Sequence, residues 1–131
     1  MKTRTKQAAF VIDYMTKNSF GTYNGGREFG SKSFSGCTTY DDDLDFICAF
    51  GDAFPPRKPD PNHILSSITL RRVLKQLSDD GYLDRGRLGN EKYVRQEPSW
   101  QFVYSLKQWV LKDIRTNGKT AEEIAIEWNG V

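Results

Sequence analysis

Cysteine, histidine and long apolar runs are scarce in this chain of 131 residues. It has two cysteines and one histidine, which lack the spacing of a metal site and are too few for a disulfide scaffold. We therefore expect free thiols at Cys37 and Cys48, no metal and no cofactor. No apolar run approaches the length of a membrane span. The chain is expected to have no membrane partner and to reside in a reducing cytoplasm.

Net charge is also low, at +2. A value this small is not typical of proteins that coat nucleic acid by bulk charge. The charge is nevertheless unevenly placed along the chain. Residues 64–97 hold seven basic and five acidic side chains, whereas residues 21–63 hold four basic and seven acidic ones. A basic region therefore follows an acidic one, which gives the chain a modest electrostatic asymmetry.

The segment of residues 67–80 has the pattern of an amphipathic helix. Its apolar residues recur at i, i+3, i+4 and i+7, which places them on one helical face. A serine precedes this run at the position of an N-cap, and Gly81 follows it at the position of a left-handed C-cap. The apolar face is made by Leu70, Val73, Leu74 and Leu77.

Two short runs with β-strand character follow this helix. Residues 82–87 and 92–95 flank a turn at residues 88–91 that contains a Gly-Asn pair. Such a pattern predicts a β-hairpin at about 82–95. A helix that ends at a glycine and leads directly into a hairpin resembles the recognition helix and wing of winged helix-turn-helix DNA-binding proteins. This resemblance covers residues 66–95 and points to the superfamily rather than to one family.

The resemblance implies a single α+β domain over residues 1–131, mainly helical, with one β-hairpin. Residues 1–97 would form the winged-helix core with its wing, and residues 98–131 would add C-terminal helices. The implied function is that of a small transcriptional or replication regulator that binds double-stranded DNA. Helix 67–80 would enter the major groove, and hairpin 82–95 would lie along the backbone.

Basic and polar side chains are placed where such an interface needs them. On the helix they point away from the apolar face, and on the hairpin they suit phosphates or the minor groove. Arginine, lysine, glutamine and threonine can all reach base edges. We expect the DNA-binding residues to be Ser67, Thr69, Arg71, Arg72, Lys75, Gln76, Arg85, Arg87, Lys92 and Arg95.

Two further helices are expected before this region, at residues 3–17 and 39–50. The second would be capped by Thr38 or Thr39 and ended by Gly51. Four of the five prolines lie in residues 54–62, which predicts an extended connection. One core should contain residues from all of these elements: Val11, Ile12, Leu44, Ile47, Leu70, Val73, Leu74, Leu77 and Leu83.

The C-terminal part predicts a long helix from Pro98 to about Arg115 and a short one from Thr120 to Trp128. The sequence Thr120-Ala121-Glu122-Glu123 has the form of a capping box. The long helix carries more large apolar side chains than one core usually absorbs. We therefore expect a homodimer whose interface includes Trp100, Tyr104 and Trp109.

Other interpretations of the sequence remain open. Asp41, Asp42, Asp43 and Asp45 favour the dipole of a helix N-terminus, and they could also contact a basic protein partner. Because these acids would repel DNA phosphates, the alternative function is a winged-helix module that binds proteins and not DNA. A small enzyme is a third possibility. His63 beside a cysteine would make a nucleophile–base pair, but nothing in the sequence brings them together, so we expect no enzyme.

Overall fold

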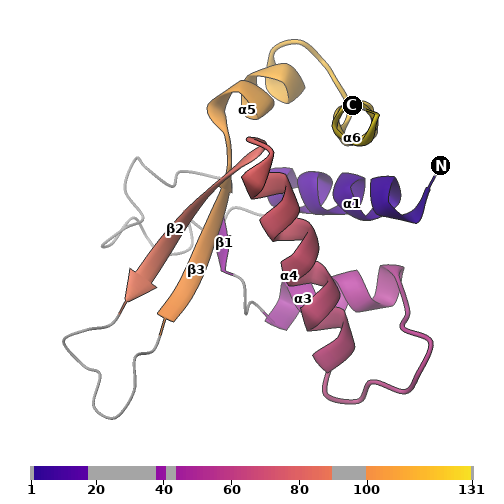
Figure 1. Cartoon of the computed structure of the whole chain (residues 1–131). Coiled ribbons are helices and arrows are strands. Elements are labelled where there is room, and N and C mark those ends of the chain that lie inside the picture. The colour runs from indigo at the N-terminus through magenta and orange to yellow at the C-terminus, as the bar shows by residue number, and fades with distance from the viewer. Residues whose placement is uncertain (1, 18–37, 41–43, 90–99, 131) are drawn as a thin grey trace.

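Five helices and three strands form the part of the chain that the computed structural model describes, residues 2–17, 38–40, 44–89 and 100–130 (Figure 1). The fold is α+β and mainly helical, as the sequence predicts. In chain order the elements are α1 (Thr3–Lys17), β1 (Thr38–Tyr40), α3 (Leu44–Ala53), α4 (Ile64–Asp79), β2 (Leu83–Gly89), β3 (Trp100–Leu106), α5 (Gln108–Arg115) and α6 (Ala121–Asn129).

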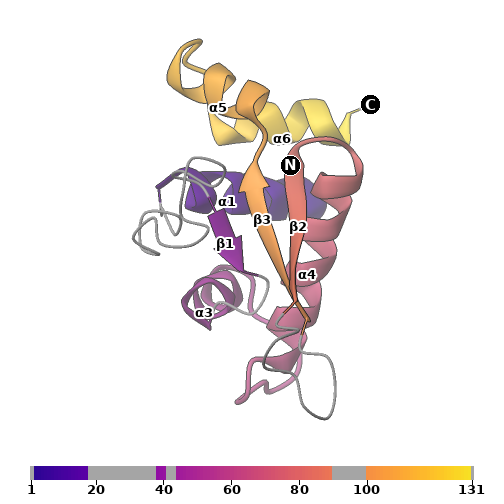
Figure 2. The same cartoon turned by 90° about the vertical axis from the view of Figure 1, so that its left-hand side faces the viewer.

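The strands form one antiparallel sheet in the order β1-β3-β2. The central strand β3 places Tyr104 between Thr39 of β1 and Arg85 of β2. Figure 1 shows the sheet beside α1, α3 and α4, and the turned view in Figure 2 shows the sheet in front of these helices. Helices α1, α3 and α4 thus cover one face of the sheet.

The predicted second helix is wrong at both ends. Thr38 and Thr39 lie in β1 and do not cap the helix, which begins at Leu44. It also continues past Gly51 to Ala53. The glycine serves helix packing instead of helix termination, since a Cβ atom at this position would lie 2.7 Å from the Ser66 hydroxyl on α4. A larger residue here would force the Ser66 side chain to move, so the close approach of α3 and α4 favours glycine. Residues 54–62 contain neither helix nor strand, as their prolines predict.

The helix predicted from Pro98 to about Arg115 is wrong in its first half. Residues 100–106 form strand β3, and only Gln108–Arg115 are helical. A run with apolar residues on every face fits a buried strand as well as a buried helix. Pairing with two neighbouring strands decides for the strand, because it satisfies the backbone groups of this segment on both sides.

The hairpin prediction is right for its first strand and wrong for its partner. Residues 83–89 form β2, so the expected turn residues Leu88 and Gly89 belong to the strand. The strand paired with β2 is β3, in a register that places Leu83 opposite Leu106 and Gly89 opposite Trp100. Residues 92–95, which we expected to pair with β2, lie outside the described residues.

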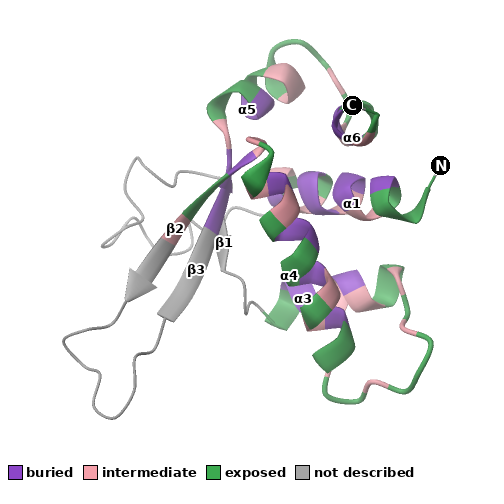
Figure 3. Cartoon of the chain, viewed as in Figure 1, coloured by how far each residue is buried: buried purple, intermediate pink, exposed green. Residues whose placement is uncertain are grey.

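One hydrophobic core joins the helices to the sheet (Figure 3). It contains eight of the nine residues predicted for it: Val11, Ile12, Ile47, Leu70, Val73, Leu74, Leu77 and Leu83. The ninth prediction, Leu44, is wrong, because this side chain is 61% exposed at the first residue of α3. The C-terminal helices contribute Val110, Leu111, Ile124, Ala125 and Trp128 to the same core.

Candidate nucleic-acid interface

Helix α4 begins one turn earlier than the sequence predicts, because an aspartate caps it. His63 occupies the N-cap position with φ 58° and makes no side-chain cap. Asp60 takes that role: its carboxylate accepts hydrogen bonds from the backbone amides of Leu65 at 3.0 Å and Ser66 at 3.1 Å. Desolvation acts to raise the pKa of Asp60, but these hydrogen bonds outweigh it and hold the pKa below its usual value. The serine expected as N-cap, Ser66, lies buried inside the helix.

The faces of α4 differ sharply in burial (Figure 3). Leu70, Val73, Leu74 and Leu77 are at most 3% exposed and pack into the core. On the opposite side Arg71, Arg72 and Lys75 are exposed, as the helical wheel predicts. Burial of one face fixes the rotation of α4 about its axis. The basic side chains are therefore held toward solvent by the packing of the leucines behind them.

Acidic neighbours partly compensate the basic face at its C-terminal end. Lys75 Nζ lies 2.8 Å from Asp79 Oδ2, one turn further along the helix, and both side chains are more than half exposed. The hydrogen bond from Lys75 lowers the pKa of Asp79, and the nearby positive charge of Arg85 lowers it further. Arg85 on β2 thus lies within electrostatic reach of the end of α4.

The remaining predicted contact residues fall into two groups. Ser67, Thr69 and Gln76 are half-buried on the flanks of α4, away from its most exposed stripe. Thr69 borders a hollow formed with the N-terminus of α1 and the proline-rich connection. The second group lies outside the side chains that the structure describes: Arg87, Lys92 and Arg95.

The C-terminal end of α4 is held by α5. Gly81 has φ +88°, the left-handed conformation predicted for the residue after the helix. Trp109 donates a hydrogen bond from its indole Nε1 to the Gly81 carbonyl at 3.1 Å. Its ring also packs edge-on against Tyr82, with centroids 4.9 Å apart. Through Trp109, helix α5 therefore stabilises the turn that connects α4 to β2.

These contacts change the interpretation of the expected dimer interface. Tyr104 is only 3% exposed and belongs to the core, so its assignment to an interface is wrong. Trp109 is 43% exposed but has a role within the chain. The side chain of Trp100 lies outside the described part of the structure. The helical surface that motivated a homodimer is not present, and dimerisation stays a prediction without a described contact that supports it.

The structure places two residues in contact that no sequence pattern links. The sulfur of Cys48 on α3 lies 3.6 Å from Nε2 of His63, at the start of α4. Both side chains are half-buried, so the contact links the two helices near their junction. Among the described residues, no third side chain of a metal-binding type joins Cys48 and His63.

Sequence reasoning missed Ile64 at the beginning of α4. Ile64 and Ile68 are 58% and 48% exposed, on the same side of the helix as Arg72 and Lys75. The signal lies upstream at Asp60: an aspartate shortly before an apolar run is typical of a helix start. Recognising it would have moved the start of α4 to include Ile64.

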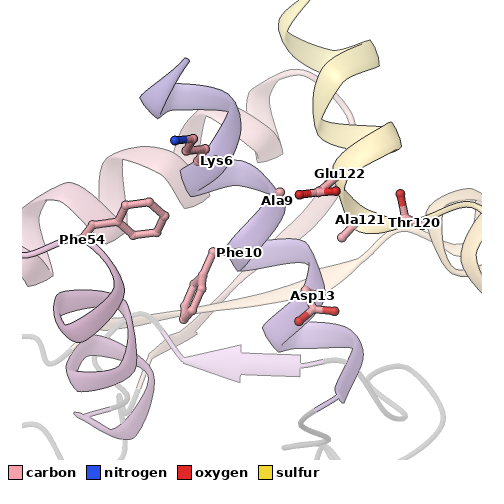
Figure 4. A pocket seen from close by; sticks show the side chains of 8 residues that line it. All are labelled: Lys6, Ala9, Phe10, Asp13, Phe54, Thr120, Ala121 and Glu122. Carbon is pink, nitrogen blue, oxygen red and sulfur yellow. The ribbon is translucent and has the colours of Figure 1, made fainter. Parts of the chain in front are cut away.

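A hollow of about 420 Å³ lies elsewhere, between α1, α6 and the end of α3 (Figure 4). Phe10 and Phe54 meet edge-on in its wall, with ring centroids 5.8 Å apart. Its charged lining residues are of mixed sign, Lys6, Asp13 and Glu122, and the hydroxyl of Thr120 caps α6. The charges of this hollow are mixed, whereas those of the exposed face of α4 are mainly basic, so the face of α4 is the stronger candidate site.

Comparison with known proteins gives no relative: no protein-family model, curated protein or solved structure matches the chain. Within the described ranges, every helix is too short or too polar to traverse a lipid bilayer.

Proposed function

We propose that this chain is a winged-helix protein that binds double-stranded DNA and acts as a small transcriptional or replication regulator. Helices α3 and α4 would form the helix-turn-helix, and strands β2 and β3 the wing. The exposed face of α4 would enter the major groove, where arginine and lysine side chains recognise guanine edges and phosphates.

One observation carries the proposal: α4 has a fully buried leucine face and an exposed basic face, and a further arginine lies close to its end. Arg71, Arg72 and Lys75 share a rigid helix, so their spacing is fixed before any ligand binds. Arg85 lies on the same face of the sheet as buried Leu83, because alternate residues of a strand share a face. The positive charge is thus concentrated on the helix and on the side of β2 that faces it.

The ion pair between Lys75 and Asp79 is compatible with this function. Exposed pairs of this kind contribute little to stability, so a phosphate can compete with Asp79 for the lysine. Of the acidic residues that favour a protein partner instead, positions 41–43 lie outside the described residues, and Asp45 is exposed in the first turn of α3.

A salt series tests the function directly. The affinity of the wild type for random-sequence duplex DNA should fall steeply with salt, because each neutralised phosphate releases counterions. The double variant Arg71→Ala/Arg72→Ala should bind more weakly and should lower the slope of log K against log [salt] by up to about 1.8. The matched control is Lys112→Ala/Arg115→Ala, which removes the same charge from exposed positions on α5. Equal binding by wild type and the α4 variant would reject the proposal and favour a protein partner.

A further inference from the structure

The most exposed stripe of α4 holds two apolar and two basic residues and ends at the acidic Asp79. Ile64, Ile68, Arg72 and Lys75 follow one another at i, i+4, i+8 and i+11, which places them along one line of the helix. All four are exposed. With a rise of about 1.5 Å per residue, the stripe is roughly 16 Å long. At one base pair per ~3.4 Å, this length covers about five base pairs.

The beginning of α4 has no capacity left to bind a phosphate. The backbone amides of Leu65 and Ser66, which would otherwise face an anion at the helix N-terminus, already donate to the carboxylate of Asp60. That carboxylate is itself negative. A DNA backbone is therefore not a favourable neighbour for the first turn of the helix, whereas a base edge in the groove is.

Ile64 and Ile68 also restrict which base edge fits. An isoleucine offers no hydrogen bond, so placing it against a polar base edge would desolvate that edge without compensation. In the major groove the apolar group of the four standard bases is the C5-methyl group of thymine. Arg72 and Lys75, further along the same stripe, supply the positive charge that attracts the duplex.

We propose that Ile64 and Ile68 contact thymine methyl groups, so that the protein prefers duplex DNA containing thymine beneath the beginning of α4. This inference rests on the proposed DNA-binding function. It assigns recognition of thymine to the apolar half of the stripe and attraction to the basic half.

The test compares two duplexes that differ only in the methyl group. The full chain is titrated against a fluorescent alternating adenine–thymine duplex and against the same duplex with uracil in place of thymine. Wild type should bind the uracil duplex more weakly, by about fourfold for each methyl group that is lost from contact. Ile64→Ala/Ile68→Ala should bind both duplexes with nearly the same affinity, and Ile68→Ala alone should lose part of the preference. Since Ile64 and Ile68 are exposed, both variants should fold normally.

The matched control is Ile126→Ala on α6, which truncates an isoleucine that is 52% exposed outside α4. It should keep the wild-type preference for thymine. Equal wild-type affinity for both duplexes, with the salt dependence retained, would overturn the methyl inference and leave the DNA-binding function intact. Absence of salt-dependent binding to either duplex would overturn both.

A third duplex separates the two sources of a C5-methyl group. In a guanine–cytosine duplex, replacing cytosine with 5-methylcytosine adds the same methyl group to a different base. The proposal expects this duplex to bind no better than the unmethylated one, because arginine and lysine, and not isoleucine, suit the adjacent guanine edge. A preference for 5-methylcytosine without a preference for thymine over uracil would contradict it.

Discussion

Two single residues at the ends of α4 decide where the helix begins and ends, and through it where the basic face lies. Asp60 satisfies amides at its N-terminus, and Gly81 adopts the left-handed backbone conformation after its C-terminus. Neither residue belongs to the hydrophobic core. Both act on the backbone, so their effects on stability can be separated from those of packing.

Gly81→Ala should destabilise the protein by about 1–2 kcal/mol, because an L-residue is strained at this positive φ. A Cβ atom here would meet nothing within 4 Å, so the loss measures backbone strain and no clash. Gly86→Ala is the matched control: it also has open space around it, and its φ lies outside the left-handed range. Urea unfolding of both variants gives the comparison, and equal losses at the two positions would refute strain as the cause.

Asp60 should make stability depend on pH. Its pKa is depressed in the folded protein, so its contribution is present above the usual aspartate pKa and is lost as the pH falls through the folded value. Asp60→Asn, which keeps an oxygen acceptor without the charge, should weaken this acid dependence. Asp60→Ala should lose the cap at all pH values. Thermal unfolding measured from neutral to acidic pH distinguishes the two variants. If the stability of Asp60→Asn fell with pH as that of wild type does, Asp60 would not be the source of the pH dependence.

At the scale of elements, α4 combines three tasks that occupy different parts of its surface. Its leucine face anchors it in the core, its two ends fix its direction, and its outward side carries the candidate interface. Helix α5 supports this arrangement by holding the turn at Gly81 through Trp109. The candidate interface thus lies on a regular helix, which has few backbone conformations to lose on binding.

If α4 faces DNA, Asp79→Asn should raise the affinity for random duplex DNA. The substitution removes a negative charge from the interface and releases Lys75 from its ion pair. Asp13→Asn is a suitable control, because Asp13 pairs with Lys17 at the same i,i+4 spacing on α1 and the substitution changes net charge equally. Fluorescence anisotropy at low salt should show tighter binding for Asp79→Asn alone. The same gain in both variants would assign the effect to net charge.

At the scale of the whole molecule, the last helix, α6, packs against the first, α1. Trp128 of α6 is 4% exposed, and its indole donates a hydrogen bond to Asp80 at 2.7 Å. The guanidinium of Arg4 on α1 lies 4.2 Å from the centre of its ring. This one side chain therefore joins α1, the end of α4 and α6.

Trp128→Ala should cost about 3–5 kcal/mol of stability, as is usual for a large buried aromatic residue. The exposed Ile126→Ala on the same helix should change stability by about 0.5 kcal/mol or less. Denaturant unfolding followed by circular dichroism measures both. If Trp128→Ala unfolded like wild type, α6 would not be part of the cooperative fold.

The sequence by itself determined the local features of this protein. Periodic leucines, a following glycine and the capping box at Thr120 correctly predicted α4, its left-handed end and α6, because these signals act between residues close in the chain. The outward direction of Arg71 and Arg72 followed from the same periodicity. The functional meaning of that face is still a proposal.

Only the tertiary structure decided the rest. Residues 100–106 form a strand that pairs with β1, which is distant in sequence, and with β2, and Tyr104 consequently lies in the core and not at the expected interface. Gly51 lies inside α3 where it faces Ser66 of α4, and Cys48 of α3 contacts His63 at the start of α4. Such pairings depend on contacts between remote segments, which local periodicity does not encode.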